Sequence, residues 1–173
     1  MTAKTYLSAE RLRELLNYNP ETGVFTRKIR TSNFINVGDV VGTNTQGYLC
    51  GRLNNQLYRM HHLAWLYVYG VWPEKNIDHR NGDRSDNRIA NLREADHFEN
   101  AQNIVAHKDG SSGYLGVSWH SQAKAWCARI YAYGKQHSLG VYQDPVEAHR
   151  VYLEAKADIH RFNPVPRDQL NAA

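Results

Sequence analysis

The segment Asn76-Ile77-Asp78-His79-Arg80-Asn81-Gly82-Asp83 is the most informative part of this chain, and it runs on through Asn87-Arg88-Ile89-Ala90-Asn91-Leu92-Arg93 to Glu99-Asn100. An acid–histidine pair ends an apolar strand, and a polar, turn-rich loop follows it. A second short strand and a capped helix that carries an amide come next. This order of elements can hold one divalent cation and one imidazole against the same phosphate.

Local patterns set the boundaries of these elements. A helix is expected to start at Asp96, where Glu99 at the third helical position completes a capping box. Adjacent strand residues point to opposite faces, so Asp78 and His79 converge only if the strand ends or twists there, and the turn residues that follow favour such a distortion. The other expected elements are a strand over Asn76–His79, a loop over Arg80–Asp86 and a strand over Arg88–Leu92.

The region before this segment also predicts short strands and helices. A helix is expected to open at Ser8, Asn54-Asn55 to form a hairpin turn, and Gly70 to end a second helix. The expected strands are Val24–Arg27, Tyr48–Leu53 and Leu57–Met60, and the second helix covers His61–Tyr69.

The polar residues of the segment suit phosphodiester hydrolysis. That reaction needs an activated water, stabilisation of charge on the phosphoryl oxygens, and help for the departing oxyanion. Asp78 offers a carboxylate and Asn100 an amide oxygen, and hard cations such as magnesium prefer such oxygen ligands. His79 is expected to be the general base, because a free imidazole titrates near ~6.5. Asn91 is expected to bond the loop backbone and fix the position of His79.

Several neighbouring residues leave alternatives open. Asn87 competes with Asn91 for the central structural role, although a turn asparagine usually bonds its own backbone. Asn103 is either a group behind the site or a solvent-facing residue. Of His61 and His62, one is expected to pack beneath the site and neither to be catalytic.

The ordered set resembles the HNH nuclease motif, the ββα-metal hairpin and helix of homing endonucleases and related DNA-cutting enzymes. The resemblance implies that Asp78 and Asn100 are metal ligands, His79 the general base and Asn91 the central asparagine. Asn100 stands in place of the second histidine that names the motif, as phage homing members tolerate, and this argues against zinc or nickel. The resemblance extends over residues 7–103 through Thr22-Gly23-Val24-Phe25, Gly47-Tyr48, Leu63-Ala64-Trp65 and Asn91-Leu92-Arg93.

A second small domain is expected after a segment of linker composition, Ala106–Gly113. Short connections between the strands predict an antiparallel meander. A helix start follows, with Asp144 as N-cap and Pro145 at the first position. The expected strands are Tyr114–Trp119, Ala125–Tyr131 and Gln136–Val141, and the helix runs to about His160.

Residues 113–162 resemble an AP2/ERF domain through Gly113-Tyr114-Leu115-Gly116-Val117-Ser118-Trp119, Trp126-Cys127-Ala128-Arg129-Ile130, Leu139-Gly140-Val141-Tyr142 and Glu147-Ala148. The resemblance implies a three-stranded sheet, backed by one helix, whose exposed face enters the major groove. Plant members carry arginines where Leu115 and Ser118 stand and a tryptophan where Ser138 stands, so contacts to particular bases are not carried over. The alternative is a small sheet domain that packs on the nuclease or binds protein. The candidate DNA contacts are Ser118, His120, Lys124, Arg129, Tyr131, Lys135 and His137.

The composition of the chain limits which partners, metal sites and cellular locations these predictions allow. The chain has 173 residues and a net charge of +4, which allows a nucleic-acid partner without demanding one. Cys50 and Cys127 are far apart, so thiolates cannot form a zinc knuckle, and both are expected to be reduced. No apolar run approaches the ~20 residues that span a bilayer, and no secretory signal is present, so we expect an intracellular, phage- or bacterium-encoded protein without membrane contact.

The sequence therefore predicts an α+β protein with an HNH nuclease domain over residues 1–105, a linker over 106–112, an AP2/ERF-like domain over 113–163 and a tail over 164–173. The expected function is that of a site-specific, homing-type endonuclease that cuts double-stranded DNA as a monomer or homodimer with Mg²⁺, for which Mn²⁺ can substitute. The alternative is a DNA-binding regulator that keeps the scaffold without activity. Five basic residues are either further phosphate contacts or a solvated face: Arg27, Lys28, Arg30, Arg52 and Arg59.

Overall fold

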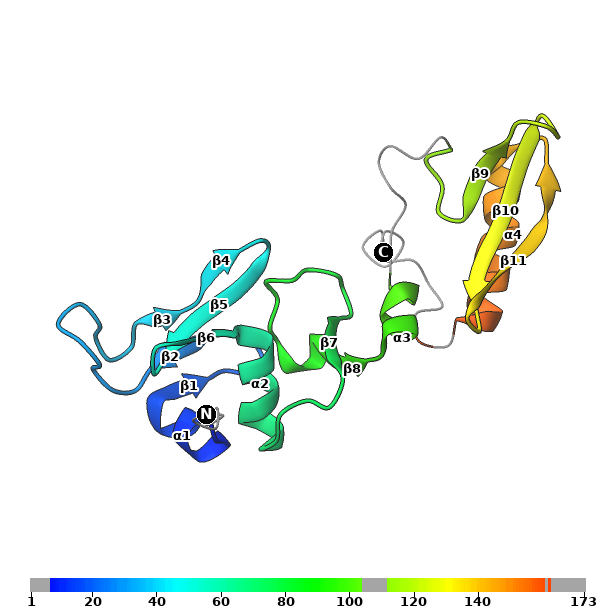
Figure 1. Ribbon diagram of the computed structural model, residues 1–173. Helices are drawn as coiled ribbons and strands as arrows, with labels where there is room; N and C mark the ends of the chain where they lie inside the picture. Colours follow the sequence, from blue (N-terminus) through cyan, green and yellow to red (C-terminus); the bar gives the residue numbers. More distant parts are fainter. Residues whose placement is uncertain (1–6, 104–111, 161, 163–173) are drawn as a thin grey trace, which may run out of the picture. The chain divides into compact units, whose positions relative to one another are not determined.

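The computed structural model describes residues 7–103, 112–160 and 162, which form small antiparallel sheets and a few helices (Figure 1). Contacts between residues divide the chain into two units, Met1–Ala95 and Asp96–Ala173, and each is described by itself. The expected tail and all of the expected linker except Ser112 lie outside the described residues. Within the described part, no helix has both the length and the apolar character needed to cross a membrane.

The first unit is built on two helices and three small sheets. The hydroxyl oxygen of Ser8 accepts a hydrogen bond from the Arg11 amide and caps the first helix, as the sequence predicted. Gly70 adopts the left-handed conformation that ends the second helix. The elements are α1 (Ala9–Leu15), β1 (Leu16–Tyr18), β2 (Phe25–Arg27), β3 (Val40–Val41), β4 (Thr43–Thr45), β5 (Tyr48–Leu53), β6 (Gln56–Arg59), α2 (Met60–Tyr69), β7 (Asn76–His79), η1 (Ile89–Asn91) and β8 (Leu92–Ala95).

The strands of the first unit pair in chain order, as β1-β2-β3, β4-β5-β6 and β7-β8. The hairpin between β5 and β6 turns at Asn54-Asn55, both with positive φ, which confirms the predicted turn. Leucines of α1 and α2 and Phe25 of β2 form the core, and Leu92 at the start of β8 packs into it. The pair β7-β8 is thereby attached to the body of the unit.

One predicted strand in this region is wrong. Arg88–Leu92 was expected to be extended, but Ile89–Asn91 form a 3₁₀ turn and the strand begins only at Leu92. The Asn91 amide donates to the Arg88 carbonyl at 2.9 Å, and the Ile89 amide donates to Pro20, far away in the sequence. These bonds replace the ladder bonds that a strand would make, so Asn91 lies before the strand and not on it.

The second unit contains a short helix and a separate sheet backed by a longer helix. The capping box is confirmed, because Asp96 Oδ1 accepts from the Glu99 amide and Glu99 Oε2 accepts from the Asp96 amide. The predicted cap at Asp144, with Pro145 at the first position, is confirmed as well. The elements are α3 (His97–Gln102), β9 (Val117–His120), β10 (Ala125–Ala132), β11 (Lys135–Tyr142) and α4 (Pro145–Ile159).

The sheet of this unit has the order β11-β10-β9, and α4 runs along it (Figure 1). Val117, Ala128 and Ala148 form its small core. The first strand starts at Val117, later than the expected Tyr114. Gly116, with a φ of 76°, lies so close to the Tyr152 ring that a side chain there would overlap it, so the chain turns before the strand can begin.

Candidate active site

Asp78 and His79 end strand β7 and are both buried. The strand register places Asp78 opposite Arg93 of β8. The Nε and Nη2 atoms of Arg93 each lie 2.9 Å from Asp78 Oδ2, so the guanidinium balances the buried carboxylate charge. Arg93 is a site residue that the motif alone did not reveal, and only the pairing of β7 with β8 identifies it.

The loop after His79 is a closed and hydrogen-bonded structure. The Gly82 amide donates to the His79 carbonyl at 2.8 Å, and Gly82 has the positive φ that this tight turn requires. The Arg80 amide donates to the Asn91 carbonyl at 2.9 Å, which joins the two ends of the loop. Strand β7 therefore ends at His79, where turn-forming residues predicted its end.

The side chain of Asn91 holds this loop from inside. Its Oδ1 accepts from the Asn81 amide at 3.0 Å, and its Nδ2 donates to the Asp86 carbonyl at 2.8 Å. An asparagine can make both bonds at once because its amide has an acceptor at one end and donors at the other. Asn91 is buried and ties the beginning of the loop to its end.

Asn87 lies beside His79. Its side-chain amide contacts the His79 ring and not the Asn87 backbone, which the turn sequence had favoured. Asn87 Oδ1 is 3.4 Å from His79 Nε2, and Asn87 is 1% exposed. The Nδ2 atom of Asn87 has no hydrogen-bond partner among the residues that the structure describes. With Oδ1 facing the ring, the contact orients the imidazole of His79.

Two residues from the N-terminal part of the chain contact the backbone around Asn87 and hold it in place. The Tyr18 hydroxyl donates to the Asn87 carbonyl at 2.7 Å. Gly23 packs against the same peptide, because a Cβ atom on Gly23 would lie only 2.5 Å from the Arg88 nitrogen. Neither contact could be inferred from sequence, since the partners are more than sixty residues apart.

The ring of His79 lies among other rings. His61 packs perpendicular to it with centroids 4.9 Å apart, and Tyr48 lies at 6.2 Å. Burial lowers the pKa of His79, although Asn87, Asp78 and the two loop aspartates oppose the change. His79 is therefore neutral at pH 7, which is the form that accepts a proton.

Asn100, the other expected metal ligand, lies exposed on α3 in the second unit. The residues described in the structure contain no cluster of three or more His, Cys, Asp or Glu that could hold a metal. Magnesium needs no such cluster, because it is usually bound by one or two oxygen ligands, several waters and substrate phosphate. The donor chemistry of Asp78 and Asn100 therefore fits magnesium and does not fit zinc.

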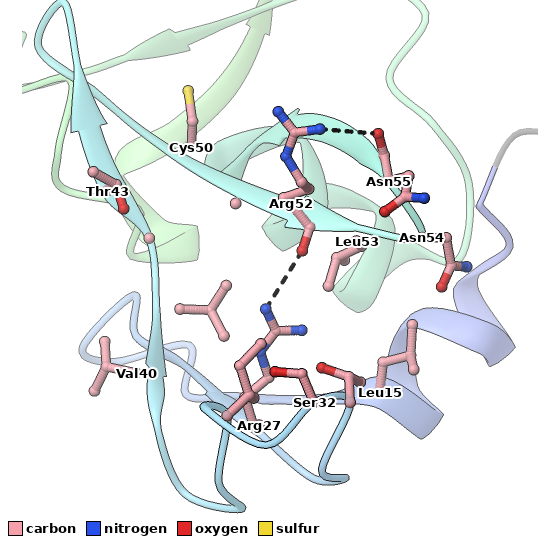
Figure 2. A pocket seen from close by; sticks show the side chains of 15 residues that line it. Leu15, Arg27, Ser32, Val40, Thr43, Cys50, Arg52, Leu53, Asn54 and Asn55 are labelled. Atoms are coloured by element: carbon pink, nitrogen blue, oxygen red, sulfur yellow. Dashed lines mark hydrogen bonds between the residues drawn. The ribbon is translucent and has the colours of Figure 1, made fainter.

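A separate hollow of about 560 Å³ lies in the first unit, between the residues after β2 and the β5–β6 hairpin (Figure 2). Arg27 and Arg52 line it, and the Arg27 guanidinium donates to the Arg52 carbonyl at 3.4 Å. Asp78 and His79 do not line this hollow, so it is no part of the candidate active site. Its arginines remain candidates for phosphate contacts.

The residues of the β9–β10–β11 sheet that are expected to contact DNA differ in their exposure and in their hydrogen bonds. Two of the histidines bond the local backbone, since His120 Nδ1 accepts from the Ala123 amide and His137 Nε2 lies 3.2 Å from the Ala132 carbonyl. The Tyr131 hydroxyl likewise donates to the Gly134 carbonyl. The exposed residues of the set are Ser118, Lys124, Tyr131 and Lys135, whereas His120, Arg129 and His137 are half-buried.

Comparisons with known proteins agree with the motif. Residues 58–102 match a family model described as HNH endonuclease, a range that contains Asp78, His79, Asn91 and Asn100. The chain is 35% identical over 82 residues to Protein 3.8 of Escherichia phage T7, an alignment that covers 47% of this chain and 68% of that protein. No solved structure matches. The family match ends before β9, so it carries no information about the sheet formed by β9, β10 and β11.

Proposed function

We propose, because this chain belongs to the HNH endonuclease family, that it is a DNA endonuclease in which His79 is the general base of phosphodiester hydrolysis. The observation that carries the proposal is the state of His79. This residue is buried, neutral at pH 7 and held between Asn87 and His61 at the end of a strand. A neutral imidazole in a fixed orientation can take the proton of an attacking water.

The remaining residues of the motif have supporting roles in this proposal. Asn91 keeps the loop closed and so holds the backbone of His79 in place. Asp78 and Asn100 are the proposed ligands of a divalent cation, Mg²⁺ or Mn²⁺. Such a cation, when bound, stabilises charge on the phosphoryl oxygens and on the leaving oxyanion. Arg93 keeps the Asp78 carboxylate in a defined orientation through two contacts to one oxygen.

Site-specific cutting of the homing type is the finer part of the proposal. The sheet of β9, β10 and β11 is proposed to bind double-stranded DNA in the manner of an AP2/ERF domain, and the single helix α4 packed on a three-stranded antiparallel sheet supports this. Its exposed Lys124 and Lys135 suit contacts to phosphates, and Arg129 and Ser118 suit contacts in the groove. Deleting residues 106–173 is expected to weaken the choice of site.

A supercoiled plasmid incubated with magnesium or manganese tests the proposed reaction. The wild-type protein should nick or linearise it, and His79→Ala should abolish cutting while DNA binding is retained. His97→Ala, which removes an exposed histidine outside the loop, serves as the control and should cut normally. If the wild-type protein binds DNA but cuts no member of a genome-scale target library, the chain is a DNA-binding regulator and the enzymatic proposal is wrong.

A further inference from the structure

Two arginines lie against the ring of Tyr48 at the edge of the candidate active site. The guanidinium carbon of Arg59, at the end of β6, is 4.5 Å from the centre of that ring. The guanidinium carbon of Arg84, in the loop after His79, is 5.0 Å from the same centre. The Tyr48 ring is itself 6.2 Å from the ring of His79. Residues from three separate elements thus bring two cations to the ring of Tyr48, beside the proposed base.

These two positive charges are not neutralised by carboxylates. Neither Arg59 nor Arg84 forms an ion pair within residues 7–95, the described part of this unit. Two carboxylates of the neighbourhood pair with other arginines, Asp78 with Arg93 and Asp86 with Arg88, and the single negative charge of Asp83, which accepts a hydrogen bond from Ser85, does not balance two arginines. The faces of an aromatic ring attract cations but leave their charge intact, so the site has an excess of positive charge.

The start of helix α2 increases that excess. Helix α2 starts at Met60 with no side-chain cap and no acidic residue in its first turn, so its positive end is also unbalanced. His61, whose ring is 5.3 Å from Tyr48, is buried, and its Nδ1 has no hydrogen-bond partner in the described chain. Burial is the main cause of the lowered pKa of both His61 and His62, and the charge of Arg59 lowers both further, so that charge lies close to them.

We infer that Arg59 and Arg84, positioned by Tyr48, form a binding site for one phosphate group of the nucleic-acid backbone, the phosphodiester on which His79 acts. Guanidinium groups suit this task because their N–H donors match the oxygens of a phosphate. Donors fixed before the reaction also stabilise the charge that develops on those oxygens. The identification of the phosphate as the reacting one rests on the proposed function, whereas the anion site rests on the geometry alone.

Titration with inorganic phosphate in metal-free buffer tests the anion site, with the ring signals of Tyr48 and His79 followed by NMR. Saturable shifts are expected in the wild type, and Arg59→Gln or Arg84→Gln should each raise the half-saturating concentration about fivefold or more. Arg11→Gln, which removes an arginine already paired with Glu14, should leave it unchanged. Equal half-saturation in all four proteins, or no saturation in the wild type, would overturn the inference.

Tyr48 is assigned as a positioning residue, and conservative replacement tests this role. Tyr48→Phe keeps the aromatic face and should bind phosphate like the wild type, whereas Tyr48→Leu should resemble the arginine variants. Equal binding by Tyr48→Leu and Tyr48→Phe would show that the ring does not position the guanidiniums. Because no bond is cut in these titrations, they remain valid even if the protein proves not to be a nuclease.

Binding to a short DNA duplex at several salt concentrations shows whether one phosphate is held. If both arginines hold the same phosphate, the slope of log affinity against log salt should fall by about one in the double variant and by less in each single variant, because the remaining arginine still neutralises that phosphate. A fall of about two in the double variant would mean two separate phosphates, and no fall would mean no contact; either result contradicts the assignment. Normal plasmid cutting with unchanged slopes would refute the phosphate site and leave the proposed function intact.

Discussion

Asp78 and Arg93 form a buried ion pair whose two halves depend on each other. Their side chains are 8% and 11% exposed, and both Arg93 nitrogens contact one oxygen of the carboxylate. Arg93→Met should therefore cost about 3–5 kcal/mol of unfolding free energy, because it leaves a buried charge without its partner. Urea unfolding of the wild type, Arg93→Met, Asp78→Asn and the double variant measures the coupling. If the double variant loses as much unfolding free energy as the two single variants lose together, the two residues are not coupled and this account is wrong.

The same variant reports on the proposed metal ligand. With the guanidinium removed, the Asp78 carboxylate loses the positive charge of Arg93, so a bound magnesium ion should stabilise Arg93→Met more than the wild type. The thermal midpoint of each protein, measured with and without magnesium, gives this difference. Asp78→Asn should show no such stabilisation, and an equal response of all three proteins would remove Asp78 from the list of ligands.

The buried histidines make the stability of the protein depend on pH. Burial lowers the pKa of His61 from 6.5 to about 2, and the pKa values of His62 and His79 are lowered as well. Below pH 6.5 the unfolded chain binds protons that the folded chain does not, so unfolding becomes easier as the pH falls. His61 contributes roughly 1 kcal/mol per pH unit in this range. Urea midpoints should decrease between pH 7 and 5, and His61→Leu should decrease less steeply; parallel curves would contradict this account.

The loop between β7 and η1 depends on a glycine far away in the chain. Gly23 has a φ of 72°, and a Cβ atom there would lie 2.5 Å from the Arg88 nitrogen and 2.6 Å from the Asn87 carbonyl carbon. Gly23→Ala should cost about 2–4 kcal/mol, and by moving Asn87 it should also slow plasmid cutting. Gly38→Ala is the matched control, because Gly38 has a φ of 90° and open space around it. Equal losses in the two variants would mean that only backbone strain matters at Gly23.

The elements that sequence predicts well are those fixed by neighbouring residues. The Ser8 cap, the Asn54-Asn55 turn and the Asp96–Glu99 capping box depend on chemistry within a few residues, and all three are confirmed. The prediction of a strand over Arg88–Leu92 was wrong because the hydrogen bond from the Ile89 amide to Pro20 joins residues far apart in the sequence. Arg93 and the cations on Tyr48 were not identified for the same reason: strand register and ring contacts appear only once distant segments have paired.

At the scale of the whole molecule, the contact units separate α3 from the β7–β8 pair and group it with α4. Two bonds account for this grouping. Lys156 Nζ of α4 donates to the Gln102 carbonyl at the end of α3, and the Phe162 amide donates to Gln102 Oε1. The helix that carries Asn100 therefore depends on residues beyond the nuclease motif.

Lys156→Met tests that dependence in the full chain. Lys156 is fully buried, its pKa is lowered by burial to about 8, and its Nζ lies 2.9 Å from the Gln102 carbonyl and 3.2 Å from His160 Nδ1. A methionine of similar volume removes this donor from both acceptors, which should cost about 1–3 kcal/mol in the second unit. Amide exchange in α3 should become faster, and more magnesium should be needed for half-maximal plasmid cutting, because Asn100 is then held less firmly. Arg150→Met, on the exposed face of the same helix, should change neither quantity. If α3 exchanges faster while the magnesium requirement stays constant, Asn100 is not a metal ligand.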